Sequence, residues 1–302
     1  MAQGGYLYRV KRKVTFLMRR GSFYPSSRRK DIPERTVFHK IFVNSLFAFL
    51  LAYVFVYLVF NLTILLSAAA FNIPTLLSYA EISYIVKGTG WTSDAVKIIF
   101  SSGPFIMLLL GTVMLFLYQY VSHETGILKL VVLWIYSLSI VQCLGEITVG
   151  SLLGEGFGYV LMYMYVNDTM VLVITVLALC GMVAAGVLST RQYLVSANSY
   201  FNDLPHRLNR KFLVFQFLFP FVAGNIIIYL VKLPGITLYE LFVNATMVFV
   251  LLPVIIRGGT MADFYFDEEP RQVKLVFPMI LASIIVLILF RLVLNSGLRI
   301  LM

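Results

Sequence analysis

The chain has 302 residues and a mean hydropathy of +0.89, with 60% hydrophobic and 13% charged residues. Soluble domains carry about a quarter charged residues, and a chain of this length could not bury so much apolar surface in a soluble core. The formal net charge is +10, and the positive charge is concentrated near the amino terminus. Composition therefore excludes an ordinary soluble protein and predicts an all-α, polytopic transmembrane helical bundle.

Residues 1–40 form a basic segment, with eleven lysines and arginines against Asp31 and Glu34. Beside a membrane, such a segment is expected to contact anionic lipid headgroups rather than nucleic acid. The candidates for lipid contact are Arg19, Arg20, Arg28, Arg29 and Lys30. The segment is too long and too charged to be the start of a cleaved signal peptide, so we expect a retained cytoplasmic tail.

About seven apolar stretches follow, each long enough to cross roughly 30 Å of hydrocarbon. They lie at about 41–70, 98–121, 127–150, 169–190, 212–232, 236–256 and 275–298. Together they predict a single transmembrane domain over 41–302. The glycine-rich, aromatic stretch 152–166 leaves three alternatives open, namely a half-membrane hairpin, an interfacial helix, or the end of a tilted third span.

The distribution of positive charge between the loops predicts the orientation. With the amino terminus in the cytoplasm, nineteen of the 24 lysines and arginines lie on the inner side, and the other five lie in outer loops or at outer span ends. A cytoplasmic amino terminus therefore fits the excess of positive charge that cytoplasmic loops carry.

Three ionisable residues fall at similar depth in the outer parts of different predicted spans: Glu146, Glu240 and Arg291. A charge at mid-membrane costs roughly 2.5–3.5 kcal/mol on insertion scales, so such groups pair with one another or face water. One interpretation is a polar pocket that opens outward, with Arg291 balancing one carboxylate. The other is that each side chain reaches the interface separately, or that an ion pair merely locks the bundle. Further polar candidates for the pocket are Gln142, Asn225 and Asn244.

The sequence contains no complete catalytic or metal-binding motif. His123-Glu124 resembles the start of HExxH, but Ile127 stands where the second histidine should be. Cys143 and Cys180 are not part of a CxxC pair, and no phosphate-binding glycine loop is present. We therefore expect no catalytic residue, no metal and no cofactor.

The stretches "SSGPFIMLLLGTVMLFLYQY" (101–120) and "LVVLWIYSLSIVQCLGEITVG" (130–150), with the glycine-rich segment to 165, resemble spans of site-2-type intramembrane metalloproteases and their degenerate bacterial relatives. The chain departs from that family because no HExxH precedes the Gly-Pro span and no Asp-Gly ligand motif follows in 201–232. The resemblance implies a member that lacks the zinc ligands and does not cleave peptides, located in a bacterial inner membrane.

Three classes of function remain open. A structural or accessory subunit of a membrane complex, with other membrane proteins as partners, explains the many spans, small loops and lack of a cofactor motif. A transporter or channel would use the polar cluster in the outer half of the bundle. An intramembrane hydrolase-like protein would need a reactive group of residues that the sequence does not complete.

Overall fold

The computed structural model describes residues 34–85, 90–122, 126, 128–266 and 273–300, and seven segments in this part of the chain are helical, long and apolar enough to cross a membrane. Five segments are centred on one long helix each: α2 (Glu34–Ala70), α3 (Ser93–Val121), α4 (Leu128–Leu153), α6 (Asp168–Val195) and α11 (Phe277–Asn295). A short 3₁₀ turn, η2 (Ser196–Ser199), follows α6. The seven predicted spans and the all-α fold class are confirmed, and the protein is a multi-pass membrane protein.

The other two spans are interrupted. The fifth consists of α7 (His206–Leu213), a π-helical turn η3 (Val214–Leu218) and α8 (Phe219–Lys232). The sixth consists of α9 (Leu238–Ala245) and α10 (Val248–Gly258), separated at Thr246 and Met247. The sequence analysis predicted an apolar span over about 236–256 without locating this turn, so the turn is a new finding.

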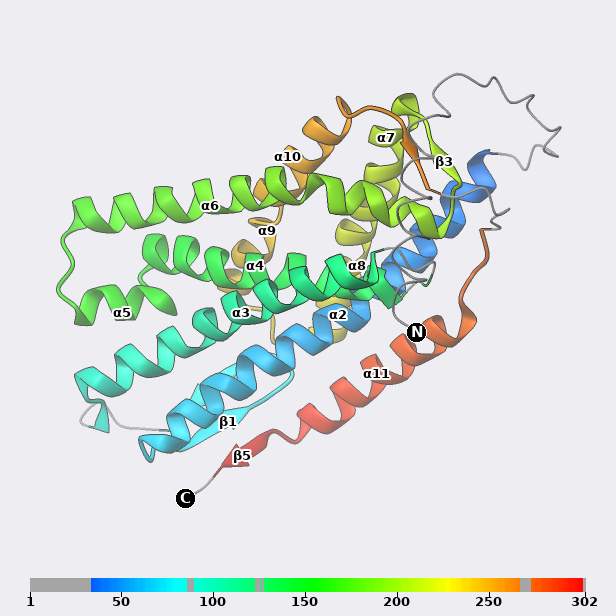
Figure 1. Cartoon of the computed structure of the whole chain (residues 1–302). Coiled ribbons are helices and arrows are strands. Elements are labelled where there is room, and N and C mark those ends of the chain that lie inside the picture. The colour runs from blue at the N-terminus through cyan, green and yellow to red at the C-terminus, as the bar shows by residue number, and fades with distance from the viewer. Residues whose placement is uncertain (1–33, 86–89, 123–125, 127, 267–272, 301–302) are drawn as a thin grey trace, which may run out of the picture. The chain divides into compact units, whose positions relative to one another are not determined.

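The helix α4 is the centre of the bundle. It packs against α3, α5, α6 and α9, and Figure 1 shows it between α3 and α6. Glycine allows close approach, because a Cβ at Gly145 would lie 2.6 Å from Thr246 Oγ1, at the break in the sixth span. The indole ring of Trp134 packs edge-on against Phe49 of α2, with ring centroids 5.0 Å apart.

The first helix begins earlier than predicted. Because α2 starts at Glu34, residues 34–40 are its first turns rather than the end of a separate tail. The Lys40 ammonium group donates a hydrogen bond of 3.3 Å to the Val273 carbonyl oxygen, just before α11. The lipid-contact candidates Arg19, Arg20, Arg28, Arg29 and Lys30 lie outside the described residues.

Two small antiparallel sheets connect segments that are far apart in the chain. At one end of the spans, β1 (Thr75–Leu77) pairs with both β2 (Ile82–Tyr84) and β5 (Leu298–Ile300), with Leu76 opposite Ser83 and Arg299. This sheet joins the end of the first span to the end of the seventh (Figure 1). At the other end, β3 (Asp203–Leu204) pairs with β4 (Phe264–Tyr265).

The stretch 152–166 forms a tight turn and then the short helix α5 (Phe157–Tyr163). Positive φ angles at Gly154 (70°) and Gly156 (52°) reverse the chain, a conformation that glycine adopts without strain. A Cβ at Gly158 would collide with the carbonyl oxygen of Gly150, so α5 lies directly against α4. Seven residues span only about 10 Å, too short to cross a membrane. The stretch therefore adds no further crossing: after the turn, α5 is a short helix packed against α3 and α4, and its position relative to the membrane stays a prediction.

Candidate ligand pocket

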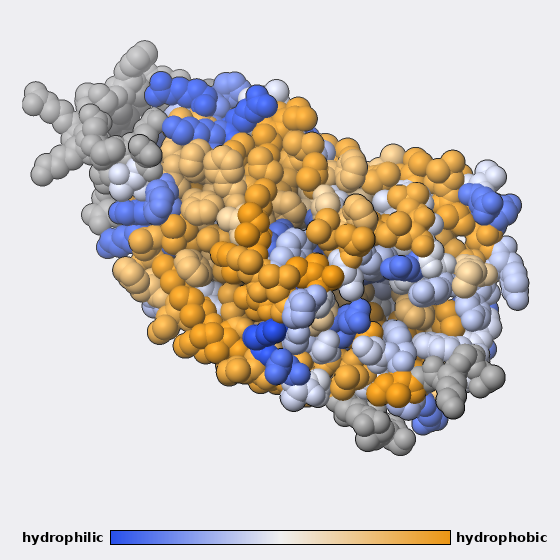
Figure 2. All heavy atoms as spheres, turned by 180° about the vertical axis from the view of Figure 1, so that it is seen from behind, coloured by the Kyte–Doolittle hydropathy of each residue, from blue (hydrophilic) through white to orange (hydrophobic). Residues whose placement is uncertain are grey.

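A pocket of about 630 Å³ lies at the end of the bundle where β1 and β2 are found. Its walls come from α2, β2, the start of α3, the last turns of α4, α5 and α9. Figure 2 shows that hydrophilic residues gather at the ends of the molecule and around a hollow between apolar surfaces. Polar groups are therefore reachable from outside the apolar bundle.

Glu146 lies on the last turns of α4 and is 6% exposed. Gln142, one turn earlier on the same face, donates from Nε2 to Glu146 Oε1 at 2.9 Å. The Tyr239 hydroxyl of α9 donates to Oε2 of the same carboxylate. Both donors are neutral, and among the described residues no lysine, arginine or histidine pairs with Glu146.

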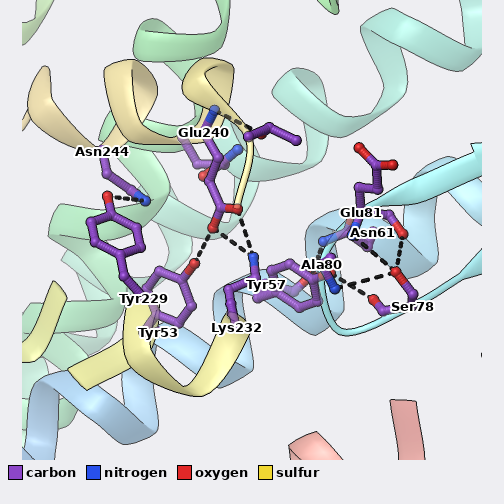
Figure 3. A network of polar contacts seen from close by, with 12 residues as sticks. Tyr53, Tyr57, Asn61, Ser78, Ala80, Glu81, Tyr229, Lys232, Glu240 and Asn244 are labelled. Carbon is purple, nitrogen blue, oxygen red and sulfur yellow. Dashed lines mark hydrogen bonds and ion pairs between the residues drawn. The ribbon is translucent and has the colours of Figure 1, made fainter. Parts of the chain in front are cut away.

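Glu240 has a different environment (Figure 3). It lies in the first turn of α9, which Thr237 caps by accepting a hydrogen bond of 3.2 Å from the Glu240 backbone N–H. The Lys232 ammonium group, fully buried at the end of α8, lies 2.6 and 2.7 Å from the two carboxylate oxygens. The Tyr53 hydroxyl donates to Oε1 at 2.5 Å, and Lys232 also lies 4.3 Å from the centre of the Tyr57 ring. This glutamate has its own counter-ion.

Asn244 lies one turn further along α9, just before the break in the sixth span. Its Nδ2 donates to the Tyr229 hydroxyl at 3.2 Å (Figure 3). At the break, the Thr246 hydroxyl donates to the Val243 carbonyl oxygen at 2.7 Å. The interrupted span therefore forms part of the pocket wall.

Two predicted candidates lie elsewhere. Arg291 does not balance a carboxylate, because its guanidinium donates to the Leu233 carbonyl oxygen at 3.1 Å and lies 3.6 Å from the centre of the Tyr79 ring. Asn225 donates to the Phe221 carbonyl oxygen of its own helix at 2.8 Å. Neither residue lines the pocket. The four candidates that do are Gln142, Glu146, Glu240 and Asn244.

Aromatic rings form one wall of the pocket. The ring of Tyr84 lies 5.2 Å from that of Trp91 and 5.6 Å from that of Phe100, and Phe100 lies 5.1 Å from Tyr159. Burial, with a smaller contribution from the Glu146 carboxylate, raises the pKa of Tyr84 above its ordinary value. Its phenol therefore stays protonated.

Sequence reasoning missed these rings and Lys232. The aromatic residues come from several elements and share no spacing. Lys232 is the last residue of the predicted fifth span, next to a proline-containing turn, and in the sequence analysis it counts only as one of the five outer positive charges. Lys232 pairs with Glu240 because the chain reverses between α8 and α9. No local sequence pattern predicts this pairing.

No group of three or more potential metal-binding side chains occurs among the residues that the structure describes. The partial motif His123-Glu124 lies outside these residues. His206 forms a hydrogen bond of 2.7 Å through Nδ1 with the Met261 carbonyl oxygen, and both cysteines are free thiols.

No protein-family model, curated protein or solved structure matches the chain. The resemblance of 101–165 to zinc-lacking relatives of site-2-type proteases therefore stays a prediction. The fold and the pocket define the class, a multi-pass α-helical membrane protein with a mostly apolar cavity at one end of its bundle, into which a few polar side chains converge.

Proposed function

We propose that the protein binds a small molecule in this pocket, as the recognition site of a transporter or of a related membrane-embedded binding protein. The observation that carries the proposal is the pocket itself, because a concave site of several hundred Å³ with mostly apolar walls and a few convergent polar groups is typical of ligand sites. The polar cluster expected from the sequence contributes four of its residues.

The sixth span supports this proposal. In transporters, substrate sites are often formed beside irregular turns of spanning helices. Here the helix tightens at Thr246 and Met247, which keep helical dihedral angles, just after Asn244, which lines the pocket.

A ligand screen tests the proposal. The purified full chain, in a maltoside detergent, is expected to unfold at a higher temperature with at least one member of a chemically diverse library of small molecules. Gln142→Leu removes a polar group from the pocket and should abolish the shift, whereas Gln119→Leu, at an exposed position of α3, should leave it unchanged. A library with no stabilising member would count against the proposal. Uptake into vesicles then distinguishes transport from binding alone.

We further propose that the amino terminus is cytoplasmic and that the membrane is a bacterial inner membrane, so that the pocket opens on the outer side. Described residues support this orientation. The end of the bundle where α2 begins carries Lys40, Arg207, Arg210, Lys211 and Lys274. The opposite end carries Glu81, Asp94, Glu155 and Asp168, and its described positive charges are Lys97, Lys232, Arg291 and Arg299.

The basic tail provides a test of this orientation and of the proposed contact with anionic lipid. Replacing Arg28, Arg29 and Lys30 with glutamine is expected to weaken binding of the full chain to anionic lipid by about 1 kcal/mol per charge near the surface. The measurement compares lipid retained after purification from membranes of defined composition. Labelling of a cysteine introduced in the first forty residues from the outer side of intact cells would contradict the orientation.

A structural or accessory subunit is the second candidate. An apolar groove of about 750 Å³ between α2, η3 and α8 favours it, because Phe42, Phe219 and Val222 line a surface that a partner helix could cover. Purification in mild detergent should then retain another membrane protein in a fixed ratio. The hydrolase-like alternative has no supporting observation among the described residues.

A further inference from the structure

We propose that the pocket binds an organic ammonium ion whose charge is balanced by Glu146. This inference rests on the proposed ligand-binding function and names the chemical class of the ligand. It is carried by three observations: the unequal pairing of the two buried glutamates, the aromatic wall beside Glu146, and the charge of the residues that surround the pocket.

The two glutamates differ in what neutralises them. Glu240 has Lys232 within 2.6 Å, so its charge is balanced inside the protein. Glu146 receives hydrogen bonds only from an amide and a phenol. A buried carboxylate held by neutral donors either keeps a proton or balances a cation that comes from outside, because an uncompensated buried charge is costly. The pocket beside Glu146 provides the space for such a cation.

The aromatic wall favours an organic ammonium ion over simple protonation of Glu146. Ammonium groups are attracted to the faces of tryptophan, tyrosine and phenylalanine rings, and sites for quaternary ammonium ligands are built as cages of such rings. Tyr84, Trp91 and Phe100 pack together on the pocket wall. Tyr84 lies near enough to Glu146 for the carboxylate to help raise the pKa of its phenol. A site for a proton alone would not need this surface.

The charges of the residues around the pocket also favour a cationic ligand. Of the described residues that line it, four are glutamates and none is lysine or arginine, and of the four only Glu240 is paired with a lysine, Lys232. Glu81 and Glu155 are exposed and lie in the connections after α2 and α4. Acidic groups around a cleft attract cations and repel anions. The pocket therefore disfavours carboxylate and phosphate ligands.

The chain carries its own probe of the pocket. It contains two tryptophans, and Trp91 lines the pocket whereas Trp134 is fully buried against Phe49 and Phe217. In a Trp134→Phe background, the emission of Trp91 reports occupancy of the pocket. The full chain is titrated in a maltoside detergent, which has no ammonium group, with choline, with n-butylamine and with 3,3-dimethylbutan-1-ol, the neutral isostere of choline. Should Trp134→Phe fail to fold, the natural chain is titrated against Trp91→Phe, which must lose the response.

The expected result is a saturable change of Trp91 emission with at least one of the two amines. The neutral isostere should bind at least about tenfold more weakly than choline. Glu146→Gln should weaken amine binding by about tenfold or more. This variant keeps the size of the side chain and its contact with Gln142. Asp168→Asn removes an exposed charge of α6 that does not line the pocket and should change the affinity by less than about threefold.

Two results would overturn the inference. Equal affinity for choline and its neutral isostere, or unchanged amine binding by Glu146→Gln, would show that the ligand need not be cationic, and the proposed ligand-binding function would stand. No response of Trp91 to either amine would also refute the ammonium ligand, and the library screen would then decide the proposed function separately.

Discussion

Replacing Lys232 with methionine is expected to destabilise the protein by about 3–5 kcal/mol, because it leaves the Glu240 carboxylate without its cation. The Lys232 side chain is fully buried and that of Glu240 is 19% exposed. With Nζ 2.6 Å from Oε1, the gross attraction is about 6 kcal/mol at an effective dielectric constant of about 20. Desolvation of the two ions offsets most of this attraction, so the intact pair adds little net stability. The large cost arises when only one partner is removed.

A double-mutant cycle separates these terms. Lys232→Met, Glu240→Gln and the combined variant are unfolded by titration with SDS from maltoside micelles, followed by tryptophan emission. The combined variant should lose about 2–3 kcal/mol less than the sum of the two single losses. Lys97→Met is the matched control, because Lys97 lies 3.9 Å from Asp94 in an exposed pair worth about 1 kcal/mol at most.

The reasoning is refuted if Lys232→Met costs no more than Lys97→Met, or if the two single losses add. Either result would mean that water or lipid headgroups reach Glu240 and replace the lysine.

Two further variants test contacts that hold the bundle together. Gly158→Ala should destabilise the protein by about 1–3 kcal/mol, since its methyl group would meet the Gly150 carbonyl oxygen, whereas Gly126→Ala, with open space around it, should have no effect in the same SDS titration. Asn44→Leu should cost about 2 kcal/mol, because its buried amide donates to the Lys274 carbonyl oxygen and accepts from a backbone N–H before α11. Faster proteolysis near residue 276 should accompany that loss. An unchanged cleavage rate would show that the Asn44 hydrogen bonds do not hold this segment in place.

The spans and part of the pocket could be predicted from the sequence, for a simple physical reason. A continuous apolar run about 20 residues long has few stable places other than hydrocarbon. A carboxylate inside such a run is costly, so Glu146 and Glu240 indicated a polar site before their positions were known. Their similar depth on neighbouring helices then follows from span length alone, and the structure brings both to one pocket.

The pairing could not be predicted, because it depends on how the chain turns. A lysine or arginine near a span end is usually taken to reach the interface, and the sequence does not show which one bends inward. Lys232 precedes Glu240 by only eight residues, and the turn before Thr237 directs both side chains to the same point. Arg291, at similar depth, meets a backbone carbonyl instead.

The break in the sixth span also had no local signal. No glycine or proline occurs between Leu238 and Leu252, and the helix is interrupted where Thr246 meets α4 at Gly145. Tertiary packing, with the Thr246 hydroxyl bonded to a carbonyl of the preceding turn, takes the place of a helix-breaking residue.

The position of α11 explains what Arg291 does in place of balancing a carboxylate. Of the 19 residues of α11, only Ser283, Phe290 and Leu294 are buried, so most of its length has few protein contacts. Hydrocarbon on the outside of a helix is as apolar as a neighbouring leucine, so packing alone holds such a helix weakly. The helix is fixed at its two ends instead. Before α11 begins, the Asn44 side chain forms hydrogen bonds with the backbone of Lys274 and Val276. After α11 ends, strand β5 pairs with β1. Arg291 adds a further attachment at this second end, because its hydrogen bond to the Leu233 carbonyl oxygen joins the last turns of α11 to the end of the fifth span.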